Sequence, residues 1–211
     1  MLSFTGGLSP DSDALVIFVT ENYEYKDKRH VLSKDVEKKI NSFLGVLKVK
    51  KIKEDINSFD ISDRKKCFII KVKNKYASYY PEENGGTFFS YLKKFKGINK
   101  IDLYPDTIEF DKDKLVTFFS EFILGFNLKS YKFDKYKTLN QDKIDKKNNF
   151  KIITSNKEKI EKKYKYYDAI KEGVFLSRDL VSEPPNVLNP ETYVKEIKKL
   201  SKFGLKIKSY N

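Results

Sequence analysis

Acidic side chains form the groups in this sequence that most resemble metal ligands. Three groups lie close together along the chain: Asp11 with Asp13, Glu82 with Glu83, and the set Asp106, Glu109, Asp111 and Asp113. Carboxylate oxygens are the ligands that hard cations prefer, so each group could bind such an ion weakly. All of them lie beside expected loops or helix starts, where acidic residues cap helices and complement the helix dipole. We therefore favour a structural role for these carboxylates over metal binding.

Histidine, cysteine and glycine motifs offer little further chemistry. His30 is the only histidine, which argues against histidine-based zinc sites and Ser-His-Asp triads, and its basic surroundings indicate a solvated surface residue. Cys67 is the only cysteine, lies in an apolar run typical of a core strand, and cannot form an internal disulfide. The pairs Gly6-Gly7 and Gly85-Gly86 are too short for phosphate-binding loops and indicate turns. The sequence thus contains no candidate catalytic, metal-binding or cofactor-binding residue.

The net charge of +13 raises nucleic acid as a partner. Residues 156–211 hold 13 Lys or Arg against 8 Asp or Glu, so the excess is spread along the chain. Lysine, asparagine, isoleucine, tyrosine and phenylalanine are abundant, a bias that the codon usage of an AT-rich genome would produce, and we favour that explanation. DNA binding through the basic surface remains the alternative. No stretch approaches the roughly 18 consecutive apolar residues of a membrane span, and the beginning of the sequence lacks signal-peptide features, so we expect a cytoplasmic protein without a membrane partner.

Apolar patterning predicts an α/β fold with a mostly parallel, mixed sheet flanked by helices, because parallel strands need helical crossovers. Strands are expected at Ala14–Thr20, Cys67–Val72, Ile98–Tyr104 (where apolar and polar residues alternate) and Phe150–Thr154. Apolar residues at helical spacing predict helices over Val36–Leu47 with Ser33 as its cap, Phe88–Phe95 and Leu115–Phe126. Residues 46–63 look charged and irregular, and a loop is expected around Pro81.

A long helix is predicted over residues 156–182, after a capping box made by Ser155 and Glu158. It would span about 40 Å and end before Pro184-Pro185. Such a helix suits a linker between an amino-terminal domain, residues 1–155, and a second unit that begins within residues 183–211.

The last residues predict one more helix and one more strand. Asn189 and Pro190 begin the helix, Gly204 closes it, and Leu205–Tyr210 alternates like a strand. One strand cannot form a stable sheet, so we expect a second α/β unit that is truncated here. The alternative is that this strand pairs with the edge of the first sheet.

Two segments resemble the leucyl (cytosol) aminopeptidase family. The first has a glycine, apolar residues and then Tyr-x-Phe-x-x-Tyr-Lys, at Gly125, Leu128, Tyr131, Phe133, Asp134, Tyr136 and Lys137. The second has Ser-Arg-Asp-Leu-Val and a double proline, with matches at Gly173, Arg178, Asp179, Leu180, Val181, Pro184, Pro185, Asn186, Leu188 and Pro190. Ser182 stands where the family usually has asparagine. In the family the first segment ends the amino-terminal domain and the second precedes the catalytic domain, so both are expected to support the junction rather than the reaction.

The resemblance implies a cytoplasmic metallo-exopeptidase that assembles as a hexamer and removes amino-terminal residues from peptides with two zinc or manganese ions. The family's metal ligands lie in later motifs, including Asn-Thr-Asp-Ala-Glu-Gly-Arg, which this sequence lacks. We therefore expect an inactive amino-terminal portion without cofactors, whose partner is the catalytic domain of the same polypeptide. The resemblance further implies a macro-domain-like fold, but no Gly-rich phosphate loop supports ADP-ribose binding. Some bacterial members also act on DNA, in keeping with the alternative above.

Overall fold

The computed structural model describes residues 2–138 and 148–210, so Met1, residues 139–147 and Asn211 lie outside it. Six strands in these residues form one sheet in the order β1-β6-β5-β2-β4-β3. The strands are β1 (Ser3–Thr5), β2 (Ala14–Val19), β3 (Ile56–Ser62), β4 (Lys65–Lys71), β5 (Lys100–Tyr104) and β6 (Asn149–Ile153). Every neighbouring pair is parallel except β3 with β4, which is antiparallel. The predicted mostly parallel, mixed sheet is therefore confirmed.

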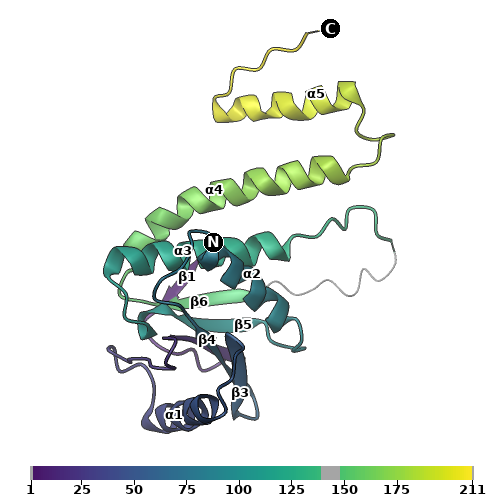
Figure 1. Cartoon of the computed structure of the whole chain (residues 1–211). Helices are drawn as coiled ribbons and strands as arrows, with labels where there is room; N and C mark the ends of the chain where they lie inside the picture. The colour runs from purple at the N-terminus through teal and green to yellow at the C-terminus, as the bar shows by residue number, and fades with distance from the viewer. Residues whose placement is uncertain (1, 139–147, 211) are drawn as a thin grey trace.

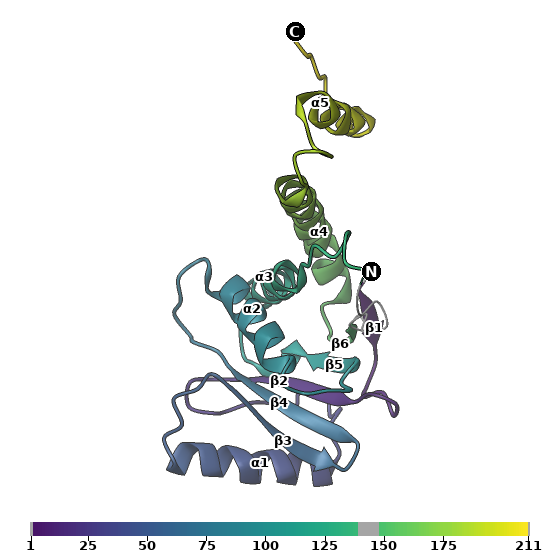
Figure 2. The ribbon, with the colours of Figure 1, turned by 90° about the vertical axis from the view of Figure 1, so that its right-hand side faces the viewer.

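Helices cover both faces of the sheet (Figures 1 and 2). Helix α1 (Lys34–Val49) covers one face, while α2 (Tyr80–Leu92) and α3 (Lys112–Ser130) cover the other. The short helix η1 (Pro105–Thr107) follows β5, and α4 (Lys157–Ser182) packs on α3 before leaving the body. Helix α5 (Pro190–Lys198) and the short helix η3 (Lys199–Phe203) stand apart from the body in both views.

The central strand β2 explains why both faces are covered. All six of its side chains are fully buried, and they alternate between two hydrophobic clusters. Val16 and Phe18 face α2 and α3, where Phe18 packs edge-on against three phenylalanine rings of α3. Leu15 and Ile17 face α1 on the opposite side. A continuous apolar run with no polar alternation is what a strand between two helical layers requires.

The first and last predicted helix starts are confirmed. Ser33 accepts a hydrogen bond from the backbone N–H of Val36 and caps α1. Asn189 caps α5 in a reciprocal capping box with Thr192, and Pro190 occupies the first turn. Gly204 closes η3 with a φ of 87°, in the left-handed region that favours glycine.

Helix α2 begins earlier than the sequence suggests. We expected a loop around Pro81 and turns at Gly85-Gly86, but Pro81 lies in the first turn and both glycines lie inside the helix. That prediction was wrong because the glycines serve close packing: a methyl group on Gly85 would lie 1.9 Å from the carbonyl oxygen of Phe122 in α3. Glycine here lets two helices touch through their backbones.

Other details of the sequence prediction need correction. Residues 46–63 are not irregular, since α1 extends to Val49 and β3 follows at the sheet edge, and the short strand β1 was not predicted. Residues 205–210 form no strand, because no other described strand lies beside them. Ser155 and Glu158 form no capping box. Helix α4 starts after Asn156, and Ser155 instead binds the carboxylate of Asp106.

Candidate functional site

The carboxyl edge of the sheet is the first place to look for a ligand site. In open α/β sheets, ligands bind where the chain leaves neighbouring strands in opposite directions. Here that point lies between β2 and β5, and the chain itself fills it. The Tyr104 hydroxyl donates to Asp27 at 2.6 Å, and the Lys26 amide donates to the Thr107 carbonyl at 2.9 Å. The loop after β2 therefore crosses the carboxyl edge of the sheet at this point and is bonded to the end of β5 and to η1.

Asp27 holds the loop after β2 in place through hydrogen bonds, and its lowered pKa predicts how the unfolding free energy depends on pH. Burial by itself raises the pKa of Asp27, but the Tyr104 hydroxyl and the amides of Leu32, Val31 and Arg29 outweigh it and lower the pKa below 3.8. A lowered folded-state pKa adds stability above the unfolded pKa, and that stability is lost as the pH falls through the folded value. As the pH falls from about 5 to about 2, the unfolding free energy should decrease less in Asp27→Asn than in the wild type, and urea titration at each pH measures this difference. An unchanged acid slope in the variant would contradict this assignment.

The carboxylate groups singled out by sequence are engaged in structural contacts. Asp11 pairs with Lys100 at 2.7 Å, and Asp13 accepts the amides of Asn99 and Lys100 at 2.8 Å each. Glu82 and Glu83 lie in the first turn of α2. Contacts of the third group run from Asp106 to Thr154 and Ser155, from Glu109 to Lys26 and Lys28, from Asp111 to the Lys114 amide, and from Asp113 to Lys159. Asp111 is the cap of α3, as the structural interpretation predicted.

Glu109, Cys67 and His30, which the sequence analysis also considered, occupy ordinary structural positions. Hydrogen bonds from Lys26 and Lys28 lower the pKa of Glu109 to about 2, which keeps it an ion-pair partner. Cys67 is fully buried, and burial raises the pKa of its thiol, as expected of a core residue. His30 is exposed in the loop after β2. In the described part of the chain, no three His, Cys, Asp or Glu side chains gather as metal ligands. Within the same residues, no helix is both long and apolar enough to cross a membrane.

The two family-like segments do meet in space. Arg178, on α4, donates to the carbonyl of Leu128 in the last turn of α3 at 2.6 Å, and its guanidinium lies 5.4 Å from the centre of the Tyr131 ring. The Tyr131 hydroxyl donates to Asp179 at 2.8 Å, and its ring packs 5.2 Å from the ring of Phe175. Two stretches about 50 positions apart therefore form one junction.

A second set of contacts lies at the carboxyl-terminal end of α4. Lys135 lies 2.6 Å from a carboxylate oxygen of Glu183, and the Tyr136 hydroxyl donates to the other oxygen. The hydrogen bonds from Lys135 and Tyr136 lower the pKa of Glu183, whose side chain is only 9% exposed. Glu183 is the residue directly after the helix. These contacts stabilise the charged form of Glu183 at the end of α4.

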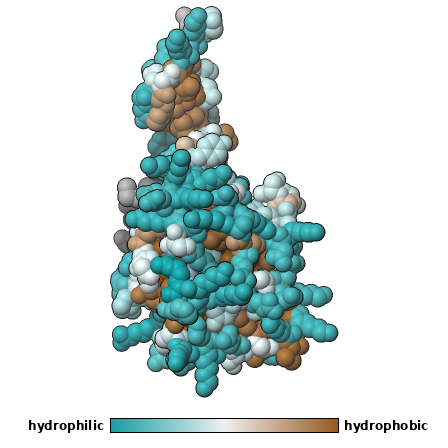
Figure 3. Space-filling model, turned by 90° about the vertical axis from the view of Figure 1, so that its left-hand side faces the viewer, coloured by the Kyte–Doolittle hydropathy of each residue, from teal (hydrophilic) through white to brown (hydrophobic). Residues whose placement is uncertain are grey.

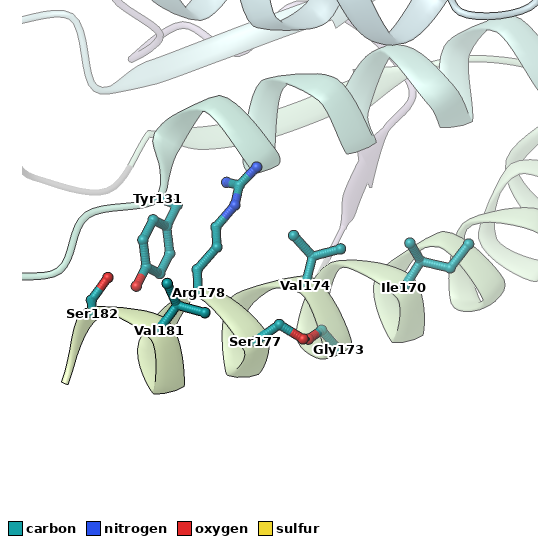
Figure 4. A pocket seen from close by; sticks show the side chains of 8 residues that line it. All are labelled: Tyr131, Ile170, Gly173, Val174, Ser177, Arg178, Val181 and Ser182. Atoms are coloured by element: carbon teal, nitrogen blue, oxygen red, sulfur yellow. The ribbon is translucent and has the colours of Figure 1, made fainter. Parts of the chain in front are cut away.

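An open, largely apolar groove of about 630 Å³ runs along this junction. Figure 4 shows Arg178, Val174 and Ile170 projecting from α4 toward α3, with Tyr131 at one end. The remaining lining residues, Gly173, Ser177, Val181 and Ser182, lie on α4. None of the lining side chains is an acid, a cysteine or a histidine, so the groove has no group suited to general-base catalysis or metal binding.

The sequence identified the junction residues as motif members, but it could not show their partners. Lys135 and Glu183 are not among the matched motif residues, and Leu128 takes part through its backbone carbonyl. Their roles depend on how α3 and α4 cross, which is set by packing across the whole domain. Only the order of the two motifs, around a helix, hinted that they meet.

Comparisons with known proteins place this fold and junction in context. No family model matches the chain. A probable cytosol aminopeptidase of Phytoplasma mali is 36% identical over 126 residues, which cover 58% of this chain and 24% of that protein. A probable cytosol aminopeptidase of Rhizobium rhizogenes is 40% identical over 93 residues, which cover 42% of this chain and 19% of that protein. The chain thus spans less than a quarter of the length of these relatives.

Solved structures agree on the class of fold. A mutant of tomato leucine aminopeptidase superposes on 96% of this chain and 42% of its own, with a TM-score of 0.70 and 18% identity. The bottromycin maturation enzyme BotP covers 92% of this chain and 38% of its own, with a TM-score of 0.61 and 11% identity. The fold is therefore the mixed α/β domain that these enzymes contain. The resemblance seen in the sequence is confirmed: the chain is a relative of the cytosol aminopeptidases that matches a fraction of their length.

Proposed function

We propose that this chain is the amino-terminal, non-catalytic domain of a leucyl aminopeptidase. The observation that carries the proposal is the coverage. Nearly all of this chain superposes on less than half of a leucine aminopeptidase, and named relatives are about four times as long as the matched segment. Motif residues of the two segments contact one another where α3 meets α4, which supports a role at a junction. The chemistry of the parent protein would then belong to residues beyond the matched part.

The expected location of the metal ligands is compatible with a non-catalytic amino-terminal domain. A metallo-aminopeptidase of this kind uses two divalent ions, zinc or manganese, to activate water against a peptide bond. The donor set for such ions does not gather in the described residues, where the carboxylates singled out by sequence cap helices or pair with lysines. In this proposal the metal ligands come from outside the described residues, and we assign no metal-binding residue among them.

The domain layout of the proposal follows from α4. Residues 1–155 form the amino-terminal domain, residues 156–182 the linking helix, and residues 183–211 the start of the next unit. Helix α4 begins on the domain, where Ile160 and Tyr164 are buried, and ends well away from it. A cytoplasmic location and a hexameric assembly of the full protein are part of the proposal, since the family has them.

Peptidase activity tests the proposal directly. We expect the purified 211-residue chain to release no leucine from leucine p-nitroanilide or leucyl peptides with added Mn²⁺ or Zn²⁺, whereas a protein that also carries the catalytic domain does so. The comparison is made at equal molar concentration, with circular dichroism as the control for folding. Metal-dependent hydrolysis by the 211-residue chain that a chelator abolishes would contradict the proposal.

DNA binding remains the alternative function, raised by the net charge of +13. Several of the lysines that contribute to this charge already contact other side chains. Lysines pair with acids at the sheet edge, as Lys100 does with Asp11, or lie over aromatic rings, as Lys94 does over Tyr91 and Lys163 over Tyr167. Figure 3 shows a broadly hydrophilic body, with a larger apolar patch on the upper part of the molecule. We therefore do not extend the proposal to DNA.

A further inference from the structure

Helix α4 is held to the domain in two different ways along its length. In its first half Ile160 is fully buried, and the Tyr164 hydroxyl accepts a hydrogen bond from Asn127 at 2.8 Å. Tyr167 donates to Glu121 of α3 at 2.7 Å. Beyond Tyr164 no residue of α4 is buried, although the helix continues to Ser182. Buried side chains therefore hold the first half, whereas the apolar side chains of the second half are at most partly buried.

Without further contacts, the second half of α4 could change its direction relative to the domain. A 26-residue helix is about 39 Å long at 1.5 Å per residue, so its end can move far for a small change in angle. Figure 1 shows α4 diverging from α3 toward its end. The groove lined by Val174 and Val181 lies along the part where the helix leaves the domain. Weakly packed segments of this kind open at low free energy.

The segment after α3 reaches across to this outer half. We call Tyr131–Lys137 the strap. At its start, Tyr131 holds Asp179 and stacks with Arg178, which also binds the Leu128 carbonyl. At its far end, Lys135 and Tyr136 hold Glu183. The contacts involve charged or polar groups at both ends, and they span the last two turns of α4.

We propose that the strap acts as a clamp on α4. Its contacts with Arg178, Asp179 and Glu183 fix the direction of the helix. Each contact is polar and partly exposed, so each is individually weak and sensitive to salt. Together they bridge an apolar groove that packing does not close. The strap thus sets the direction in which the chain leaves the domain, and this inference holds whether or not the parent protein is an aminopeptidase.

Distances between spin labels test the clamp. Labels at Val181→Cys, at the outer end of α4, and at Ser42→Cys, on the exposed side of α1, report the direction of the helix. Val181 is 87% exposed, and Cys67 is buried, so neither labelling nor the native thiol disturbs the core. We expect one narrow distance distribution in the labelled chain. Adding Arg178→Ala, Asp179→Ala and Glu183→Ala should broaden it roughly two-fold or more, because alanine retains the helix while the side-chain contacts at both ends of the clamp are lost.

Two controls make the result decisive. Glu196→Ala removes a lysine–glutamate pair of the same length, 2.6 Å, between Glu196 of α5 and Lys199 of η3, and should leave the distribution unchanged. Salt at about 1 M, where the Debye length is about 3 Å, should broaden the distribution of the labelled chain without the alanine substitutions. A distribution that stays narrow in both the alanine variant and high salt, or one that is already broad before either change, would overturn the clamp. Circular dichroism confirms that each variant is folded.

Discussion

Gly85→Ala is expected to destabilise the protein by about 3 kcal/mol, near the upper end of the range for overpacked cores. The added methyl group would lie 1.9 Å from the carbonyl oxygen of Phe122 and 2.9 Å from the amide nitrogen of Phe126. Both contacts are with backbone, so no side chain can rotate away. Helices α2 and α3 must separate, and the stacked rings of Phe88 and Phe122, 5.9 Å apart, must move with them.

The neighbouring glycine is a matched control for this prediction. A methyl group on Gly86 would meet Gly125 and Lys129 at 3.6 Å, an ordinary contact. Because alanine forms helices better than glycine, Gly86→Ala should be neutral or stabilise the protein by up to about 1 kcal/mol. Unfolding free energies from urea titration compare the two variants. Equal stabilities would show that α2 and α3 do not cross as closely as the structure has them.

The same glycines mark the limit of what sequence could predict. A pair of glycines before a helical stripe indicates a turn when only local preferences are considered. Their real role depends on Gly125, 40 positions later, where a methyl group would lie 1.8 Å from the carbonyl oxygen of Glu82. Close backbone contact between helices leaves no signature in either segment alone. For this reason the sequence predicts the later part of α2 and not its first two turns.

Strand prediction succeeded where burial was complete. Both faces of β2 are covered, and its continuous apolar run has no other plausible structure. By contrast, β3 lies at the sheet edge, and only Ile56 and Ile61 among its side chains are buried. Edge strands with polar residues resemble loops in sequence, which is why residues 46–63 were read as irregular.

The junction shows the same limit at the level of function. The two motifs could be matched to a family because their residues follow a fixed order along the chain. The contact of Tyr131 with Asp179, and that of Lys135 with Glu183, are tertiary and depend on the crossing of α3 and α4. Sequence therefore indicated which residues belong to the junction, and the structure shows what they hold.

Asp102 gives the other large expected effect, since Asp102→Ala should lower the unfolding free energy by about 3–5 kcal/mol. The alternation of apolar and polar residues over Ile98–Tyr104 predicts one polar side of the strand, yet the Asp102 side chain is fully buried. One of its oxygens accepts the Ser9 amide at 2.8 Å and the Ser12 hydroxyl at 2.7 Å, with Lys65 at 3.5 Å. Without the carboxylate, two donors in the loop before β2 and the Lys65 ammonium group of β4 lose their shared partner, which is costly for buried groups.

A double-mutant cycle separates loss of the charge pair from loss of the hydrogen bonds. The Lys65 side chain is 18% exposed, so in Asp102→Ala it remains largely buried without its partner. Lys65→Met added to Asp102→Ala removes that unpaired charge, and the double variant should be less destabilised than the sum of the single variants. Asp11→Ala, which breaks the exposed pair with Lys100, is the control and should shift the urea midpoint little. If Asp102→Ala behaves like Asp11→Ala, the loop before β2 does not depend on the buried carboxylate, and the amide and hydroxyl donors must be satisfied by water.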